Sequence, residues 1–187
     1  MGFLGGLFGG RKAPRKGKFV KAIDIMQTMS AKSDLRPTNK IGIVCNPGTE
    51  DFFKRLDREL TTILMGHPAT KGTRFQLIDD AYTSRWIVFD DRDVSRLTNA
   101  AVLVANAFTE REYKKRLLAV AVQVEYERRK AYWIYSYKRE RFYPFIPTGE
   151  KTRDGKAEIR LGEMMERAGV SVERTLELWY PLWGIPF

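Results

Sequence analysis

The sequence contains very few of the side chains that bind metals or form disulfides. A single cysteine, Cys45, among 187 residues excludes an intrachain disulfide framework and a cysteine-based zinc site. A single histidine, His67, excludes HExxH and two-histidine metal sites. Long apolar runs are missing as well, because the longest weakly polar stretch, residues 100–108, is half as long as a transmembrane helix requires. Most metallohydrolases and proteins that span a bilayer by a helix are therefore excluded.

Acidic residues are absent from the first 21 residues, which contain six basic ones. More than half of the formal net charge of +10 therefore lies in about a tenth of the chain. Hydrophobic residues make up 43% of the sequence, which is typical of a folded protein and argues against disorder throughout.

The N-terminal segment, residues 1–17, combines an apolar stretch with this basic block. Its large apolar residues recur with the spacing of one helical face, and at a bilayer interface the basic residues would be attracted to anionic lipid. A secretory signal peptide has the opposite order of charge and apolar run, so export is not expected. We expect a flexible segment that binds the membrane surface reversibly; a terminus without a role and a nucleic-acid contact are the alternatives. The expected membrane-contact residues are Phe3, Leu4, Leu7, Phe8, Arg11, Lys12, Arg15, Lys16 and Lys18.

Residues 18–187 are expected to form a single α+β domain. Helical periodicity predicts helices over residues 19–30, 49–66, 94–107 and 156–168, the last with Ile159, Leu161 and Met165 facing inward and Gly169 as its C-terminal cap. A short strand is expected at 41–45, a hairpin from 75–78 and 86–89, and a second hairpin from 118–126 and 131–137, joined by a turn at 127–130. Residues 142–146 continue that strand or add an edge strand. The aromatic C-terminal tail, residues 178–187, is neither periodic nor polar.

Two hairpins with helices before, between and after them predict an antiparallel sheet with helices packed mainly on one face. This order of elements loosely resembles that of the type III secretion chaperones and YbjN-like proteins, which is an analogy of fold and says little about function.

No arrangement of residues in the sequence favours catalysis. Asp79 and Asp80 are expected in a hairpin loop, while Asp90, Asp91 and Asp93 suit the start of a helix. Cys45 lies in an apolar strand and is expected to be buried, and His67 lies at a helix end with no nucleophile to activate. We therefore expect a protein that is not an enzyme and holds no metal or cofactor. An enzyme would require carboxylates to converge, for example those of Asp79, Asp80 and Glu125.

The stretch 132–145 interleaves aromatic residues with Lys138, Arg139 and Arg141, a composition that can stack bases and hold phosphates. A nucleic-acid-binding module that uses this strand and the basic N-terminus is the alternative function. Strand alternation, however, requires one set of these aromatics for the core, and nearby glutamates dilute the positive charge. Nucleic acid is therefore an unlikely partner, and a sheet surface that receives a protein partner or the aromatic tail is the preferred interpretation.

The sequence resembles the PspAB family of PspA-associated proteins. The resemblance is carried by residues 1–4 and 7–9, by Ile134-Tyr-Ser-Tyr-Lys-Arg-Glu-Arg-Phe-Tyr-Pro-Phe-Ile-Pro-Thr-Gly, by Arg153-Asp154, and by Trp179-Tyr-Pro-Leu-Trp-Gly-Ile-Pro. It implies a cytoplasmic protein tied to the phage-shock response to envelope stress, encoded near homologues of PspA or of the membrane protease HtpX. It supplies no catalytic residue.

Together these observations predict a non-catalytic adaptor or regulator at the inner face of the cell membrane, with a PspA-like protein or an HtpX-like protease as its partner. Tyrosine and tryptophan are common anchors of protein interfaces. The expected partner-binding residues are Tyr143, Phe145, Trp179 and Trp183, and the alternative is that both tryptophans pack the tail onto the sheet.

Overall fold

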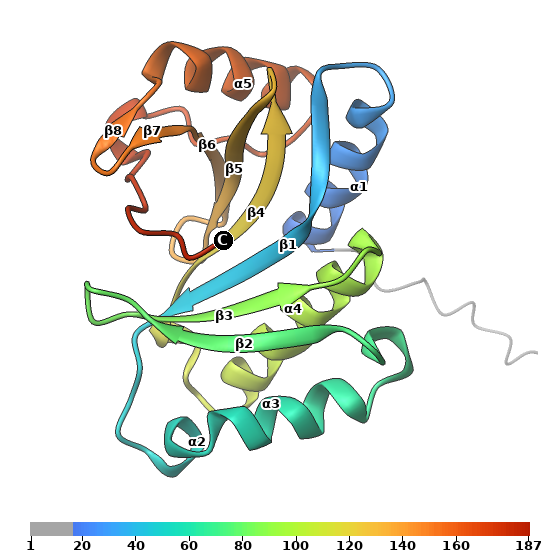
Figure 1. Ribbon diagram of the computed structural model, residues 1–187, viewed down its shortest axis with the longest axis vertical. Helices are drawn as coiled ribbons and strands as arrows, with labels where there is room; N and C mark the ends of the chain where they lie inside the picture. The colour runs from blue at the N-terminus through green and yellow to red at the C-terminus, as the bar shows by residue number, and fades with distance from the viewer. Residues whose placement is uncertain (1–16) are drawn as a thin grey trace, which may run out of the picture.

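The computed structural model describes residues 17–187 and contains a six-stranded antiparallel sheet in the order β2-β3-β1-β4-β5-β6 (Figure 1). Both predicted hairpins are present, and β1 lies between them and joins them into one sheet. The strands are β1 (Leu35–Cys45), β2 (Arg74–Asp79), β3 (Arg85–Asp90), β4 (Leu117–Tyr126), β5 (Arg129–Ser136) and β6 (Arg141–Phe145). A small separate ribbon pairs β7 (Pro147–Gly149) with β8 (Thr152–Arg153).

The first strand is longer than predicted, because it begins at Leu35 and runs through Pro37. The register against β4 shifts between Pro37 and Ile41, so the proline lies at a bulge, where its missing N–H is tolerated. The Thr38 hydroxyl donates a hydrogen bond of 3.0 Å to the Gln123 carbonyl across this irregular stretch. The expected strand 41–45 is thus the regular half of a longer one.

Five helices are found in the described residues, and the predicted positions hold with one exception. They are α1 (Lys18–Ser30), α2 (Asp51–Lys54), α3 (Leu56–Met65), α4 (Val94–Glu110) and α5 (Gly155–Arg167). The helix expected over 49–66 is interrupted at Arg55, and Glu50, not Thr49, lies at the cap position of α2. Gly169 follows the C-cap residue of α5 and has φ +94°, the left-handed conformation expected for a glycine at that position. Ile159 is 43% exposed, so the inward position expected for it is wrong.

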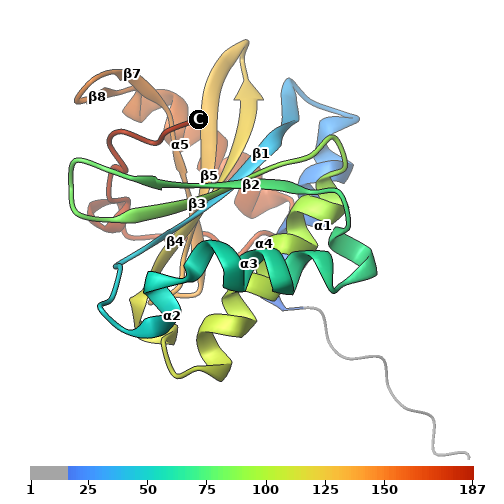
Figure 2. The same cartoon turned by 60° about the horizontal axis from the view of Figure 1, so that its bottom comes forward.

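The helices cover one face of the sheet, and the aromatic tail covers the other (Figures 1 and 2). On the helical face, the Phe19 ring of α1 lies 5.6 Å from the Tyr135 ring and 6.1 Å from the Phe142 ring. On the opposite face, the Phe187 ring lies 6.0 Å from Trp86 and 5.9 Å from Tyr132. The antiparallel α+β fold with helices mainly on one face is confirmed.

A close approach at Gly42 allows the tail to lie flat on the sheet. A Cβ atom at Gly42 would come within 2.5 Å of the Phe187 ring, so a larger residue there would push the ring away. The Tyr132 hydroxyl donates a hydrogen bond to the Phe187 carbonyl oxygen and fixes the tail at this point. The tail therefore completes the core on the face that no helix covers.

The hairpin of β4 and β5 turns through two residues, Glu127 and Arg128, with φ of 49° and 61°. Two consecutive positive φ angles are typical of a type I′ turn, which matches the twist of the flanking strands. Because the turn is this tight, the start of β4 lies beside the end of β5, where Ala119 pairs with Ser136. This end of the sheet carries the groove described below.

Candidate functional site

The four expected partner-binding residues lie together where the tail passes the β6 edge of the sheet. Tyr143, Phe145 and Trp179 are buried, and Trp183 is partly buried with its ring 5.3 Å from that of Phe145. The Tyr143 hydroxyl donates a hydrogen bond of 2.9 Å to the Tyr180 carbonyl, and burial raises the pKa of Tyr143. Both tryptophans thus pack the tail onto the fold, and of the four side chains only Trp183 offers appreciable surface to a partner.

Trp179 is held in place by α5 and by its own indole nitrogen. The Nε1–H group donates a hydrogen bond of 2.8 Å to the Glu173 carbonyl. A Cβ atom at Gly162 of α5 would come within 2.6 Å of the Trp179 ring, so the helix leaves space for the indole only because residue 162 has no side chain.

A buried ion pair beneath the tail was missed by the sequence analysis. The Glu158 carboxylate accepts hydrogen bonds of 2.8 Å from the Ile146 N–H and 2.7 Å from Arg153 Nε. Arg153 also donates a hydrogen bond of 2.7 Å to the Trp179 carbonyl, and its guanidinium lies 5.4 Å from the centre of the Phe145 ring. One pair of charges therefore joins β6, β8, α5 and the tail. The sequence offered one indication of this pair, because Arg153-Asp154 is among the residues that carry the family resemblance.

Of the expected membrane-contact residues, only Lys18 lies in the described part of the chain. Its ammonium group is 3.4 Å from the Glu140 carboxylate, in the turn between β5 and β6. Both side chains are about half exposed, so this pair adds little stability. It places the start of α1 beside the turn between β5 and β6. The other members of the set lie outside the described residues: Phe3, Leu4, Leu7, Phe8, Arg11, Lys12, Arg15 and Lys16.

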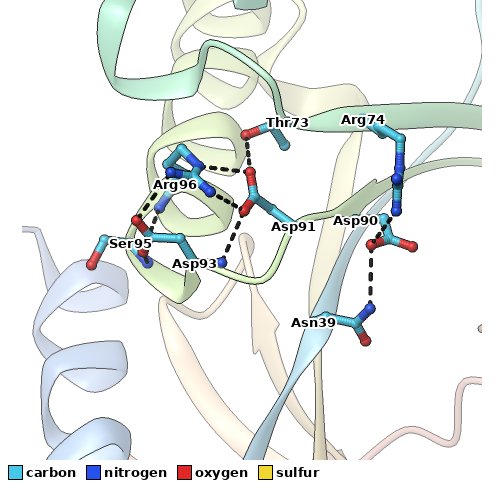
Figure 3. A network of polar contacts seen from close by, with 8 residues as sticks. All are labelled: Asn39, Thr73, Arg74, Asp90, Asp91, Asp93, Ser95 and Arg96. Carbon is cyan, nitrogen blue, oxygen red and sulfur yellow. Dashed lines mark hydrogen bonds and ion pairs between the residues drawn. The ribbon is translucent and has the colours of Figure 1, made fainter.

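Asp91 and Asp93 stabilise the start of α4 (Figure 3). Asp90 instead ends β3 and accepts hydrogen bonds from Arg74 and Asn39, so the helix position expected for it is wrong. Asp91 receives hydrogen bonds of 2.8 and 2.7 Å from the Arg96 guanidinium and one of 3.0 Å from the Thr73 hydroxyl. The hydrogen bonds from Arg96 contribute most to holding the pKa of Asp91 well below its usual range. Asp93 accepts hydrogen bonds from the Ser95 and Arg96 N–H groups, which confirms the expected helix cap.

The two carboxylates of the first hairpin also have structural partners. Arg85 donates a hydrogen bond of 2.8 Å to Asp79 and thereby lowers the pKa of this carboxyl group. Asp80 accepts hydrogen bonds from the Tyr82 and Ser84 N–H groups and from the Trp86 indole. Glu125, the third carboxylate of the enzyme alternative, lies on β4 in the other hairpin, opposite Lys130 of β5. Within residues 17–187, no three His, Cys, Asp or Glu side chains are grouped so that they could hold a metal ion.

Cys45 and His67 occupy structural positions. Cys45 is fully buried, as expected, and burial raises the pKa of its thiol to about 12. The Nδ1 atom of His67 accepts a hydrogen bond of 3.2 Å from the Ala69 N–H at the start of a short 3-10 turn.

Six of the seven aromatic residues of the stretch 132–145 are buried in the core: Tyr132, Trp133, Tyr135, Phe142, Tyr143 and Phe145. The seventh, Tyr137, is partly buried. The nucleic-acid alternative needs exposed rings on which bases can stack. The six buried rings are not available for stacking, because they pack against helices or the tail.

The described residues define a small α+β protein whose second sheet face is closed by an aromatic tail, and no helix among them is long and apolar enough to span a bilayer. The chain belongs to the PspAB family, PspA associated protein B, whose family model matches residues 1–187. Neither the curated proteins nor the solved structures gave a match. The family resemblance is thereby confirmed, and the loose likeness to type III secretion chaperones and YbjN-like proteins stays a prediction.

Proposed function

We propose that this chain is a non-catalytic adaptor or regulator of the PspA membrane-stress system. The observation that carries the proposal is the match of the whole chain to a family associated with PspA. In this proposal the partner is a PspA-like protein or an HtpX-like membrane protease, and the chain meets it at the cytoplasmic face of the membrane.

The membrane part of the proposal is supported by the sequence of residues 1–17. Four large apolar side chains would enter the interface, and each basic residue near an anionic leaflet adds about 1 kcal/mol. A weak anchor of this kind raises the local concentration of the folded domain beside a partner on the same surface. The first 17 residues are thus assigned to location and the folded residues to recognition.

The protein-binding part is supported by the surface near Trp183. This ring is partly exposed and packs on the buried ring of Phe145, and this contact restricts its rotation. Rigid aromatic side chains bind partners at a low cost in side-chain entropy.

Two measurements test the proposal. Co-sedimentation with vesicles of phosphatidylglycerol and phosphatidylcholine should fall strongly when residues 1–17 are removed. Capture of a purified PspA-like protein should fall with Trp183→Ala and remain with Met65→Ala, because Met65 is an exposed apolar residue at the end of α3, away from the tail. Equal sedimentation of both chains contradicts the anchor. Failure of the intact chain to capture either a PspA-like protein or an HtpX-like protease contradicts the adaptor.

A further inference from the structure

A groove of roughly 710 Å³ lies at the end of the sheet where β4 begins and β5 ends. It is lined by Lys114, Lys115, Leu117 and Leu118, by residues 136–140, and by Tyr180 of the tail. Two segments that are distant in sequence meet here because β4 and β5 form an antiparallel hairpin.

The charges of the groove are strongly unbalanced. Four basic side chains line it, those of Lys114, Lys115, Lys138 and Arg139, against one carboxylate, that of Glu140. Glu140 is already paired with Lys18, whereas no hydrogen bond or ion pair within residues 17–187 engages the three lysine ammonium groups. Arg139 lies 4.0 Å from Glu173, at the limit of an ion pair. The groove therefore presents a positive surface that this part of the chain does not neutralise.

Apolar surface lies beside these charges. Leu118 is 38% exposed and Tyr180 is 55% exposed, and both belong to the groove lining. A tyrosine and a leucine among lysines are typical of surfaces that rest in the headgroup region of a bilayer, where the apolar parts enter the interface and the ammonium groups meet phosphates.

The same end of the molecule carries the start of α1. Lys18 pairs with Glu140 of the groove, and the next residue, Phe19, packs on Tyr135 and Phe142 close to it. The apolar-basic segment therefore joins the folded domain beside the groove. A membrane reached by that segment would lie next to the unneutralised lysines.

We propose that this groove is a second membrane contact, which binds the phosphate groups of anionic lipid headgroups while Leu118 and Tyr180 enter the interface. The inference rests on the membrane part of the proposed function and extends it, because the folded domain itself contributes to binding and is held in one orientation. An anionic bilayer is favoured over nucleic acid by the exposed apolar side chains and by the position of α1.

The test uses the full-length chain and the chain without residues 1–17, each with and without Lys114→Gln, Lys115→Gln and Lys138→Gln. The control variant removes the same charge elsewhere, through Lys71→Gln, Lys130→Gln and Lys151→Gln, all exposed and outside the groove. Affinity for vesicles of phosphatidylglycerol and phosphatidylcholine is measured by sedimentation at low and high salt. Circular dichroism verifies that each variant is folded.

Each groove lysine should contribute about fivefold to affinity at low salt, so the triple variant should bind about a hundredfold more weakly in both backgrounds. The control should bind within about twofold of its parent, and high salt should remove the difference. Leu118→Ala should weaken binding at high salt as well, because its contribution is apolar.

Equal binding by the groove and control variants overturns the inference, and in that case a loss caused only by removal of residues 1–17 leaves the anchor standing. Binding by the shortened chain that depends on the groove lysines supports the inference even if the anchor fails. Tighter binding to a mixed oligonucleotide than to vesicles, in the same buffer and with the same lysine dependence, overturns it in favour of nucleic acid.

Discussion

Removing the Glu158 carboxylate should destabilise the protein more than any other single charge change on α5. Glu158 is 2% exposed and accepts hydrogen bonds from the Ile146 N–H and from Arg153. Glu158→Ala leaves a buried donor unsatisfied and a guanidinium that is only 24% exposed without its carboxylate. Breaking one partner of a buried pair costs about 3–5 kcal/mol. Because Arg153 keeps its bond to the Trp179 carbonyl, we expect about 3 kcal/mol.

Equilibrium unfolding in urea measures this change directly, and the melting temperature should fall by roughly 6–12 °C for a chain of this size. Glu158→Gln retains an acceptor for the Ile146 N–H and should cost about half as much. Glu163→Gln is the matched control, since Glu163 lies on the same helix in an exposed pair with Arg167 and should change stability by less than about 0.5 kcal/mol.

A second substitution tests whether the loss comes from the uncompensated charge. Arg153→Met should destabilise the Glu158→Ala protein less than it destabilises the original chain, because the two side chains interact. The reasoning is refuted if Glu158→Ala unfolds within about 1 kcal/mol of the original chain, or if the effects of the two substitutions simply add.

Two further predictions concern packing and pH. Gly162→Ala would place a Cβ atom within 2.6 Å of the Trp179 ring, so the free energy of unfolding should fall by about 1–3 kcal/mol, and an unchanged urea midpoint would contradict this contact. The pKa of Asp91 is lowered in the folded protein by Arg96, so its contribution to stability is present above the ordinary value of 3.8 and is lost as the pH falls below it. Urea titrations of the original chain and of Asp91→Asn should therefore converge toward low pH, and a constant difference between them from neutral to acid pH would refute the assignment.

Elements with strong local signals were predictable from the sequence, and the interruptions were not. Asp93 before an apolar 3.6-residue pattern predicted the start of α4, and strand alternation predicted both hairpins. The interruption at Arg55 has no glycine or proline to mark it. The predicted strand 41–45 missed the first half of β1, because pairing with β4 and a bulge after Pro37 extend the strand back to Leu35.

The candidate sites were only partly predictable, because they depend on contacts between distant segments. The burial of Phe187 depends on Gly42, which no pattern within the tail reveals. Glu158 lies on the same face of α5 as the buried Leu161 and Met165, but a glutamate normally faces solvent, and its burial is explained only by the ion pair with Arg153 of β8. The groove lysines flank a predicted hairpin, and pairing its strands in register would have brought residues 114–118 beside 136–140.

The position of β6 links the two proposed contacts. This strand begins at Arg141, next to the groove, and ends at Phe145, on which the Trp183 ring packs. Four residue steps along a strand span about 13 Å, so a chain whose groove rests on lipid headgroups would hold Trp183 roughly that far from the groove end of the strand. A partner bound to the same membrane could then contact Trp183 at this distance from the groove without displacing the groove from the lipid. If Trp183→Ala weakened vesicle binding as strongly as loss of the groove lysines, the two contacts would share one surface and this orientation would be wrong.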